Sequence, residues 1–139
     1  MMYPARHALV SGLVTAAAAL LAGVSPPMFG VWIAAGTAAG TLIDVDHVLL
    51  AMLVRGRWKA GLSWFQRPFQ AMLQPDALLS DVQYPGLARH RMVTHVAVFA
   101  VLVAGTRLHA LFVPAAVGLG AHVAVDLVLD LRHGNYLTG

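Results

Sequence analysis

Four long apolar stretches, separated by short polar segments, make up most of the chain. They cover residues 8–24, 28–50, 93–113 and 115–131. Proline separates the first two stretches at Ser25-Pro26-Pro27 and the last two at Pro114, because its ring cannot continue a helix. Each stretch offers about 17–20 apolar residues, the length that a helix needs to cross a bilayer. The pattern predicts an all-α protein, a single domain (1–139) built as a bundle of about four membrane-spanning helices.

The segment between the second and third stretches, residues 55–89, has a different pattern. Aromatic and basic side chains are mixed in its first half, which is typical of a helix or loop lying along lipid headgroups. We therefore predict that this segment lies at the membrane interface and contacts membrane lipids. The side chains concerned are Trp58, Trp64, Phe65 and Phe69, with Arg55, Arg57, Lys59 and Arg67.

The composition favours a bilayer over water as the solvent of this chain. Hydrophobic residues make up 59% of the 139 residues and charged residues 11%, and the mean hydropathy is +0.73. Soluble domains carry about 25% charged residues, so this chain lacks the polar surface of a water-soluble fold. Cysteine is absent, so a metal site has to use nitrogen and oxygen ligands.

The basic residues are unevenly distributed between the two sides of the predicted bundle. If the four helices alternate in direction, Arg107 lies on one side and eight basic residues lie on the other. Cytoplasmic segments carry such an excess, so we predict a multi-pass protein of the inner (cytoplasmic) membrane with both termini and residues 55–89 in the cytoplasm. The Arg residues form no dense run, so direct nucleic-acid binding is not expected. The eight residues are Arg6, Arg55, Arg57, Lys59, Arg67, Arg89, Arg91 and Arg132.

The same topology brings polar residues from four separate segments to the cytoplasmic face. They are imidazoles and carboxylates, which Zn²⁺, Mn²⁺ and Fe²⁺ accept as ligands. We predict a site for one or two divalent metal ions, with zinc as the first choice and manganese or iron as alternatives. The predicted ligands are His7, Asp44, His47, His90, His95, His122 and Asp126.

Helical spacing predicts how several of these side chains are oriented. His122 and Asp126 are four residues apart and share a helical face, and Asp44 and His47, three apart, can share one too. Asp46 points elsewhere in a regular helix. It is therefore predicted either to orient a ligand or act as a general base in catalysis, or to lie at a local helix break.

Residues 90–95 open the third apolar stretch. His90 and His95 are five apart and cannot share a helical face, so we expect one just before the helix and the other in its first turn. Arg91 is a candidate catalytic residue that holds an anionic substrate such as phosphate, and an Arg that extends to the headgroups is the competing interpretation. Thr94 either orients a ligand or caps the helix.

A structural interpretation competes with the metal site. A lone buried His is more often a hydrogen-bonded core residue, and an isolated Asp can pair with Arg. However, each ionisable group at depth costs roughly 2.5–3.5 kcal/mol on insertion scales, and the sequence offers no internal Lys or Arg to neutralise Asp44, Asp46 and Asp126. We therefore favour a shared cation site, and we place Asp130 outside it at a solvated helix end.

These motifs together resemble one known family. An early His, an Asp-x-Asp-His run, a His-Arg-x-x-Thr-His segment and a late His-x-x-x-Asp follow one another at residues 7, 44–47, 90–95 and 122–126. The combination is similar to the LexA-binding, inner membrane-associated, metal-dependent hydrolase family, and it covers nearly the whole chain. The chain departs from the family at Met92 and Val96, where the family has Gly and Ser. The resemblance implies a membrane-bound helical fold, metal dependence and hydrolase activity.

The function predicted from these features is metal-dependent hydrolysis of a phosphoester or acyl bond at the membrane. A site at headgroup depth makes a lipid or lipid-linked phosphoester the expected substrate. Two non-catalytic alternatives remain: a protein that binds or transports metal, and a scaffold that binds a soluble partner through residues 55–89. Transport would also require polar groups in the outer half of the bundle, and a scaffold would tolerate alanine at His95 or Asp126.

Overall fold

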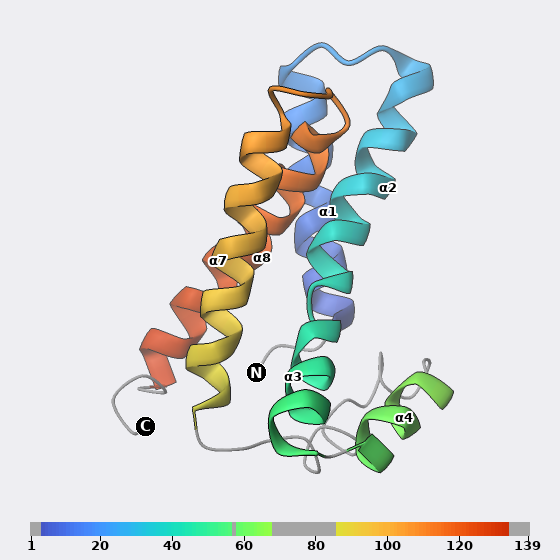
Figure 1. Cartoon of the computed structure of the whole chain (residues 1–139). Coiled ribbons are helices and arrows are strands. Elements are labelled where there is room, and N and C mark those ends of the chain that lie inside the picture. Colours follow the sequence, from blue (N-terminus) through green and yellow to red (C-terminus); the bar gives the residue numbers. More distant parts are fainter. Residues whose placement is uncertain (1–3, 57, 68–85, 134–139) are drawn as a thin grey trace.

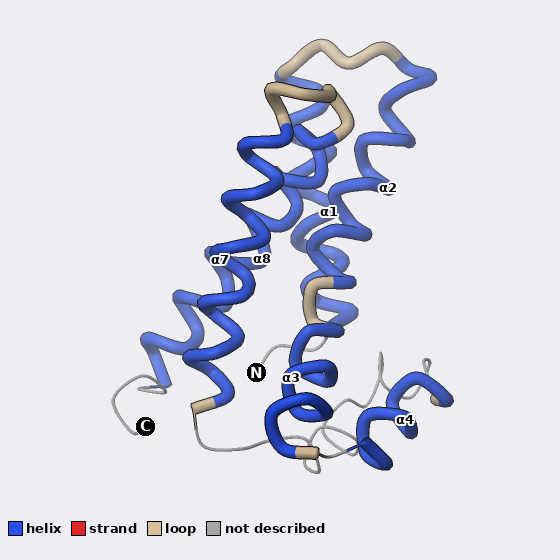
Figure 2. Tube along the Cα trace, viewed as in Figure 1, coloured by secondary structure: helices blue, strands red, loops and turns tan. Residues whose placement is uncertain are grey.

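The computed structural model describes residues 4–56, 58–67 and 86–133, and within these ranges it contains helices and no strand. The prediction of an all-helical chain is therefore confirmed for the described residues. The helices follow the chain as α1 (Pro4–Leu21), α2 (Pro26–Leu42), α3 (Val45–Arg55), α4 (Trp58–Gln66), α7 (Leu87–Gly105) and α8 (Phe112–His133) (Figure 1, Figure 2).

The long helices form an antiparallel bundle. Helices α1, α2 and α8 pack against one another, α7 packs on α8, and α3 contacts both α7 and α4. The turns that join α1 to α2 and α7 to α8 lie at one end of the bundle (Figure 1). The start of α1, the start of α7, the end of α8 and helix α3 all lie toward the other end (Figure 1). Polar side chains from distant parts of the sequence can therefore meet near α3.

A glycine cap ends α1 where the sequence predicts a turn. Gly23 has φ +64°, its N–H bonds to Leu20 O at 3.1 Å, and the N–H of Val24 bonds to Ala19 O at 3.0 Å. This pair of bonds is a Schellman motif, which favours glycine because a left-handed residue with a Cβ is strained. Pro26 then opens α2, at a position where a helix has no use for its missing N–H.

Glycines allow α1, α2 and α8 to cross closely. A Cβ on Gly118 would collide with the backbone of Gly36, and a Cβ on Gly40 would collide with the side chain of Ser11. The Ser11 hydroxyl donates to Gly118 O at 3.0 Å and links α1 to α8. Small residues four apart, such as Gly36 and Gly40, let helix backbones approach this closely. The crossing places the carbonyl of Gly40 against α8.

Some helix boundaries differ from the predicted spans. The stretch 28–50 is not one helix, because a turn at Ile43 and Asp44 separates α2 from α3, with the N–H of Asp46 bonded to Ile43 O at 3.0 Å. Helix α7 begins at Leu87 rather than near 93, and it ends at Gly105, so residues 106–111 form the turn to α8. The break predicted at Pro114 is therefore wrong, because Pro114 lies in the first turn of α8, where a helix tolerates proline. Hydropathy locates apolar segments and not helices, so it missed the polar first turn of α7.

Several polar side chains are buried in this bundle, and many large apolar ones face outward. His7, Ser11, Thr15, His95 and His122 are buried. Of the described helices, α8 is the one long and apolar enough to cross a membrane, and α1 is apolar but shorter. The four-span bundle stays a prediction. The exposed side chains include Leu9, Leu13, Leu20, Val101 and Leu131.

Part of the predicted interfacial segment 55–89 is helical. Trp58, Leu62 and Phe65 are exposed at positions that share one face of α4, and Lys59 is exposed beside them. Its contact with lipid stays a prediction. Residues 57 and 68–85 of the segment lie outside the described residues, as do the side chains of Arg55 and Trp64.

Candidate metal centre

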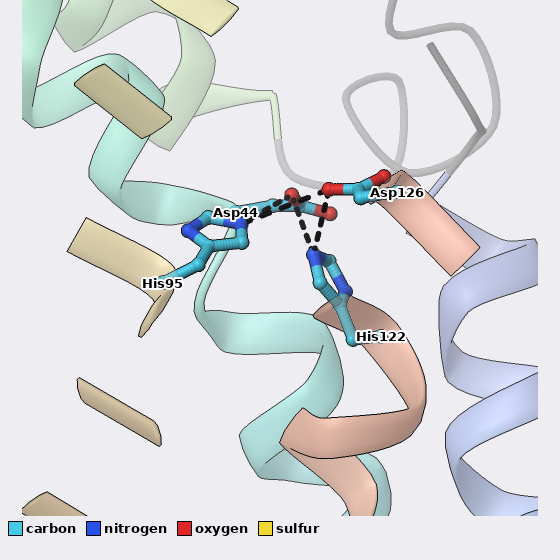
Figure 3. Close-up of side chains that lie close together, drawn as sticks. All are labelled: Asp44, His95, His122 and Asp126. Carbon is cyan, nitrogen blue, oxygen red and sulfur yellow. Dashed lines mark ion pairs between the residues drawn. The ribbon is translucent and has the colours of Figure 1, made fainter. Parts of the chain in front are cut away.

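Two imidazoles and two carboxylates converge where the α2–α3 turn meets α7 and α8. Asp44 comes from the turn, His95 from α7, and His122 and Asp126 from α8 (Figure 3). One ligand atom of each lies within 4.8 Å of all the others. The two imidazoles are fully buried, and the side chain of Asp44 is 13% exposed. Four of the seven predicted ligands therefore meet in one place, and this group could hold a metal ion.

The ligand atoms are spaced so that one cation could contact several of them. His122 Nε2 lies 3.2 Å from Asp126 Oδ2 and 3.5 Å from Asp44 Oδ1. His95 Nε2 lies 3.9 Å from each of the same two oxygens. Nitrogen and oxygen ligands bind zinc at about 2.0–2.2 Å, so ligand atoms around one ion lie roughly 3–4 Å apart.

A backbone carbonyl determines which nitrogen of the His122 ring carries a proton. Its Nδ1 lies 2.6 Å from Gly40 O, and because a carbonyl only accepts hydrogen bonds, Nδ1 carries a proton. In a neutral imidazole Nε2 is then an acceptor, and it faces Asp126 Oδ2, which is also an acceptor. Both atoms are buried with no hydrogen-bond partner among the described residues. Two such acceptors require a proton or a cation between them.

Asp46 holds His95 on the side of the ring away from α8. Nδ1 of His95 lies 3.1 Å from Asp46 Oδ2, and the hydroxyl of Thr94 donates to the same oxygen. A carboxylate on one ring nitrogen turns the other nitrogen toward a cation and raises its basicity. Of the roles predicted for Asp46 and Thr94, the geometry supports orienting a ligand. Thr94 lies well inside α7, so it does not cap that helix.

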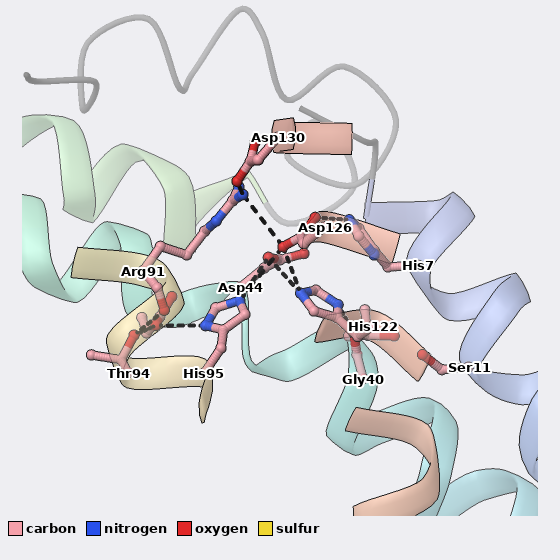
Figure 4. A network of polar contacts seen from close by, with 12 residues as sticks. His7, Ser11, Gly40, Asp44, Arg91, Thr94, His95, His122, Asp126 and Asp130 are labelled. Carbon is pink, nitrogen blue, oxygen red and sulfur yellow. Dashed lines mark hydrogen bonds and ion pairs between the residues drawn. The ribbon is translucent and has the colours of Figure 1, made fainter. Parts of the chain in front are cut away.

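His7 is buried next to the group of four but is not one of its members. Its Nε2 lies 3.3 Å from Asp126 Oδ1, and its ring stacks on that of His122 with 4.0 Å between the centroids (Figure 4). The two oxygens of Asp126 therefore face different partners, with Oδ1 toward His7 and Oδ2 toward His122. In this structure the predicted ligand His7, on α1, contacts the carboxylate of Asp126 instead of joining the group of four.

Arg91 is buried beside the group and contacts two carboxylates of α8. Its Nη2 lies 2.5 Å from Asp130 Oδ2 and 3.6 Å from Asp126 Oδ2 (Figure 4). Two expectations are therefore wrong: Asp130 is buried rather than solvated, and an internal Arg does face the carboxylates. Nor does the structure support an anion-binding or headgroup role for Arg91, because its guanidinium is already engaged inside the bundle.

The signal for this ion pair was present in the sequence. Arg91 lies four residues before His95, and Asp130 lies four after Asp126. Each of the two therefore shares a helical face with a predicted ligand. The positive charge on one of these faces and the negative charge on the other indicate the pair, whereas hydropathy does not.

Of the other predicted ligands, His90 does not join the group. Helix α7 begins at Leu87, so both His90 and His95 are helical, and the expectation that one precedes the helix is wrong. The five-residue spacing turns His90 to the exposed surface while His95 is buried. His47 lies in α3, and its side chain lies outside the described residues.

The charge balance of the cluster fits a divalent cation. Among the described side chains, Asp44, Asp46, Asp126 and Asp130 bring four carboxylates to the cluster, and Arg91 brings one guanidinium. Buried charges need compensation. A divalent ion would supply part of it, and oxygen and imidazole ligands without thiolate suit Zn²⁺, Mn²⁺ or Fe²⁺.

Comparisons with protein-family models, with curated proteins and with solved structures find no match to this chain. The family resemblance and the activity that it implies therefore stay predictions.

Proposed function

We propose that this chain is a membrane-bound, metal-dependent hydrolase whose cation is held by Asp44, His95, His122 and Asp126. The observation that carries the proposal is a pair of buried acceptors, His122 Nε2 and Asp126 Oδ2, which lie 3.2 Å apart. The other ring nitrogen of His122 donates its proton to the carbonyl of Gly40. Zinc is the expected ion, and manganese or iron would accept the same ligands.

The residues around the group prepare it for hydrolysis. A divalent ion there would lower the pKa of a bound water and polarise a phosphoryl or acyl oxygen. Asp46 and the carbonyl of Gly40 fix the orientation of the two imidazoles. Asp44 and Asp46 are 13% and 18% exposed, whereas the members on α8 are buried. Water and substrate would therefore reach the group from the side of the α2–α3 turn.

The membrane location and the substrate class belong to this proposal. The bundle exposes many large apolar side chains and buries several polar ones, an arrangement that suits a lipid solvent. The α2–α3 turn, which carries Asp44, lies toward the end of the bundle where α3 and α4 lie (Figure 1). If that end faces the cytoplasmic headgroups, a lipid or lipid-linked phosphoester is the natural substrate. The resemblance to the LexA-binding hydrolase family supports the same conclusion, because most of the residues that carry it gather here.

Elemental analysis of the detergent-purified chain tests the proposal. We expect near-stoichiometric zinc, manganese or iron in the wild type and its loss in His122→Ala. His109→Ala is the matched control, because His109 is exposed in the turn at the opposite end of the bundle, and it should retain the metal. Equal trace amounts of metal in all three proteins would overturn the proposal. Metal-dependent release of phosphate or fatty acid from mixed lipid micelles, absent in His122→Ala, would then identify the bond that is cleaved.

A further inference from the structure

The Oδ2 atom of Asp126 is approached from two sides. His122 Nε2 lies 3.2 Å from it on one side, and Nη2 of Arg91 lies 3.6 Å from it on the other. A cation bound among the four ligands would need this oxygen, and so would the guanidinium. Two positive groups on one buried oxygen also repel each other, and more strongly in a protein interior than in water. Arg91 is therefore a built-in competitor for a ligand atom.

Asp130 lies closer to the guanidinium of Arg91 than Asp126 does. Arg91 Nη2 lies 2.5 Å from Asp130 Oδ2, which is a charge-assisted hydrogen bond, whereas its 3.6 Å separation from Asp126 Oδ2 is beyond hydrogen-bond distance. All three side chains are buried. Asp126 and Asp130 stand one helical turn apart on α8, so a small movement of the guanidinium would transfer it from one carboxylate to the other.

We propose that Asp130 is a positioning residue, which holds the guanidinium of Arg91 away from Asp126 and so leaves Asp126 Oδ2 available to the cation. The inference rests on the proposed function, because it assumes a cation in the group of four. Without the charge of Asp130, a buried guanidinium loses its partner, which is unfavourable. Arg91 would then close on Asp126 and weaken cation binding.

A purely structural ion pair between α7 and α8 makes different predictions. Removing either partner would lower the stability of the bundle, and removing both would not restore the affinity for the cation. If Asp130 acts through Arg91, the effect of its loss on cation affinity requires Arg91 to be present. The double variant therefore separates the two roles.

The experiment is a Zn²⁺ titration of the detergent-purified full chain against a competing chelator. We expect Asp130→Asn to bind Zn²⁺ about 10–100-fold more weakly, the usual effect of residues that position a ligand. Asp130→Glu, which keeps the carboxylate, should recover most of the affinity. Arg91→Gln, and Arg91→Gln combined with Asp130→Asn, should bind close to the wild type. Arg89→Gln is the matched control, because it removes an exposed Arg from the same helix.

Each outcome tests either the role of Asp130 or the proposed function. Wild-type affinity in Asp130→Asn, or a double variant as weak as Asp130→Asn, would overturn the role of Asp130 while leaving the metal centre intact. A wild type that binds no Zn²⁺, Mn²⁺ or Fe²⁺ would overturn the proposed function itself. If Asp130→Asn does not fold, the double variant decides: wild-type affinity there supports the inference, because Asp130 is then needed only while Arg91 is present, and a large loss contradicts it.

Discussion

Nδ1 of His95 lies 3.1 Å from Oδ2 of Asp46, and this contact joins α7 to the first turn of α3. The break between α2 and α3 thus serves the candidate centre twice. It places Asp44 among the buried ligands, and it turns Asp46, two residues later, toward the opposite side of the His95 ring. In an uninterrupted helix, residues two apart project from different sides of the helix, so Asp44 and Asp46 could not both reach the His95 ring. The geometry therefore depends on the turn.

Asp46→Asn should weaken metal binding without abolishing it. The amide oxygen of Asn can still accept the Nδ1 hydrogen bond, but it lacks the charge that raises the basicity of the imidazole, so affinity should fall about 10–100-fold. Thr94→Val, which removes the hydroxyl and leaves the carboxylate, should have a smaller effect. Zn²⁺ titration of the two variants in detergent measures the difference. Complete loss of metal in Asp46→Asn would instead identify Asp46 as a direct ligand.

His90 and His95 should respond differently to alanine, although the sequence predicts both as ligands. His95 is fully buried in the group of four, whereas His90 is exposed on α7. We expect His95→Ala to lose the bound metal and His90→Ala to keep it, as measured by metal content per folded protein. Loss of metal in both variants would show that α7 starts later in the functional protein and turns His90 inward.

Much of the candidate site follows from sequence spacing. His122 and Asp126 are four apart on α8, and that spacing alone places both on one face, where the structure finds them. The alternation of apolar stretches with short connections predicts which ends of the helices meet. The general position of Asp44 therefore also follows, because it lies near the end of the second stretch, toward α3.

The rest of the site depends on tertiary contacts that periodicity does not contain. The partner of His122 Nδ1 is a backbone carbonyl, Gly40 O, and its availability depends on how closely α2 approaches α8. The pairing of Arg91 with Asp130 depends on the relative rotation of α7 and α8. Hydropathy also missed the true start of α7, so it predicted an inward position for His90.

Gly40→Ala should destabilise the bundle and disturb the candidate centre together. The new Cβ would collide with Ser11 and lie 2.9 Å from Gly118 O, so α1 and α8 would have to move away from α2. Overpacking of this kind costs about 1–3 kcal/mol, and the movement would lengthen the hydrogen bond that fixes His122. We expect a lower Tm and weaker Zn²⁺ binding than in the wild type.

Gly30→Ala is the matched control for that substitution. Gly30 lies on the same helix, and a Cβ there would meet nothing within 4 Å. Its Zn²⁺ affinity should equal that of the wild type, and its Tm should be equal or slightly higher, because alanine favours a helix over glycine by about 0.5–1 kcal/mol. If both variants lost the same stability, the cause would be the loss of glycine from α2 and not the helix crossing.

The topology can be tested with single cysteines, because the chain contains none. Leu108 is exposed in the turn between α7 and α8, and Gln66 is exposed at the end of α4, toward the opposite end of the bundle. If basic residues keep one end of the bundle in the cytoplasm, a membrane-impermeant maleimide should label Leu108→Cys in intact bacterial cells. It should label Gln66→Cys only after the cells are permeabilised.

The opposite labelling pattern would place the candidate centre on the outer face, where a cytoplasmic substrate cannot reach it. A third outcome is that neither position is labelled before lysis and the chain is recovered in the soluble fraction. The exposed leucines and valines would then face water and not lipid. The lipid substrate class would then lose its support. The group of four would remain, because its geometry comes from the packing of α2, α7 and α8 and not from the solvent around them.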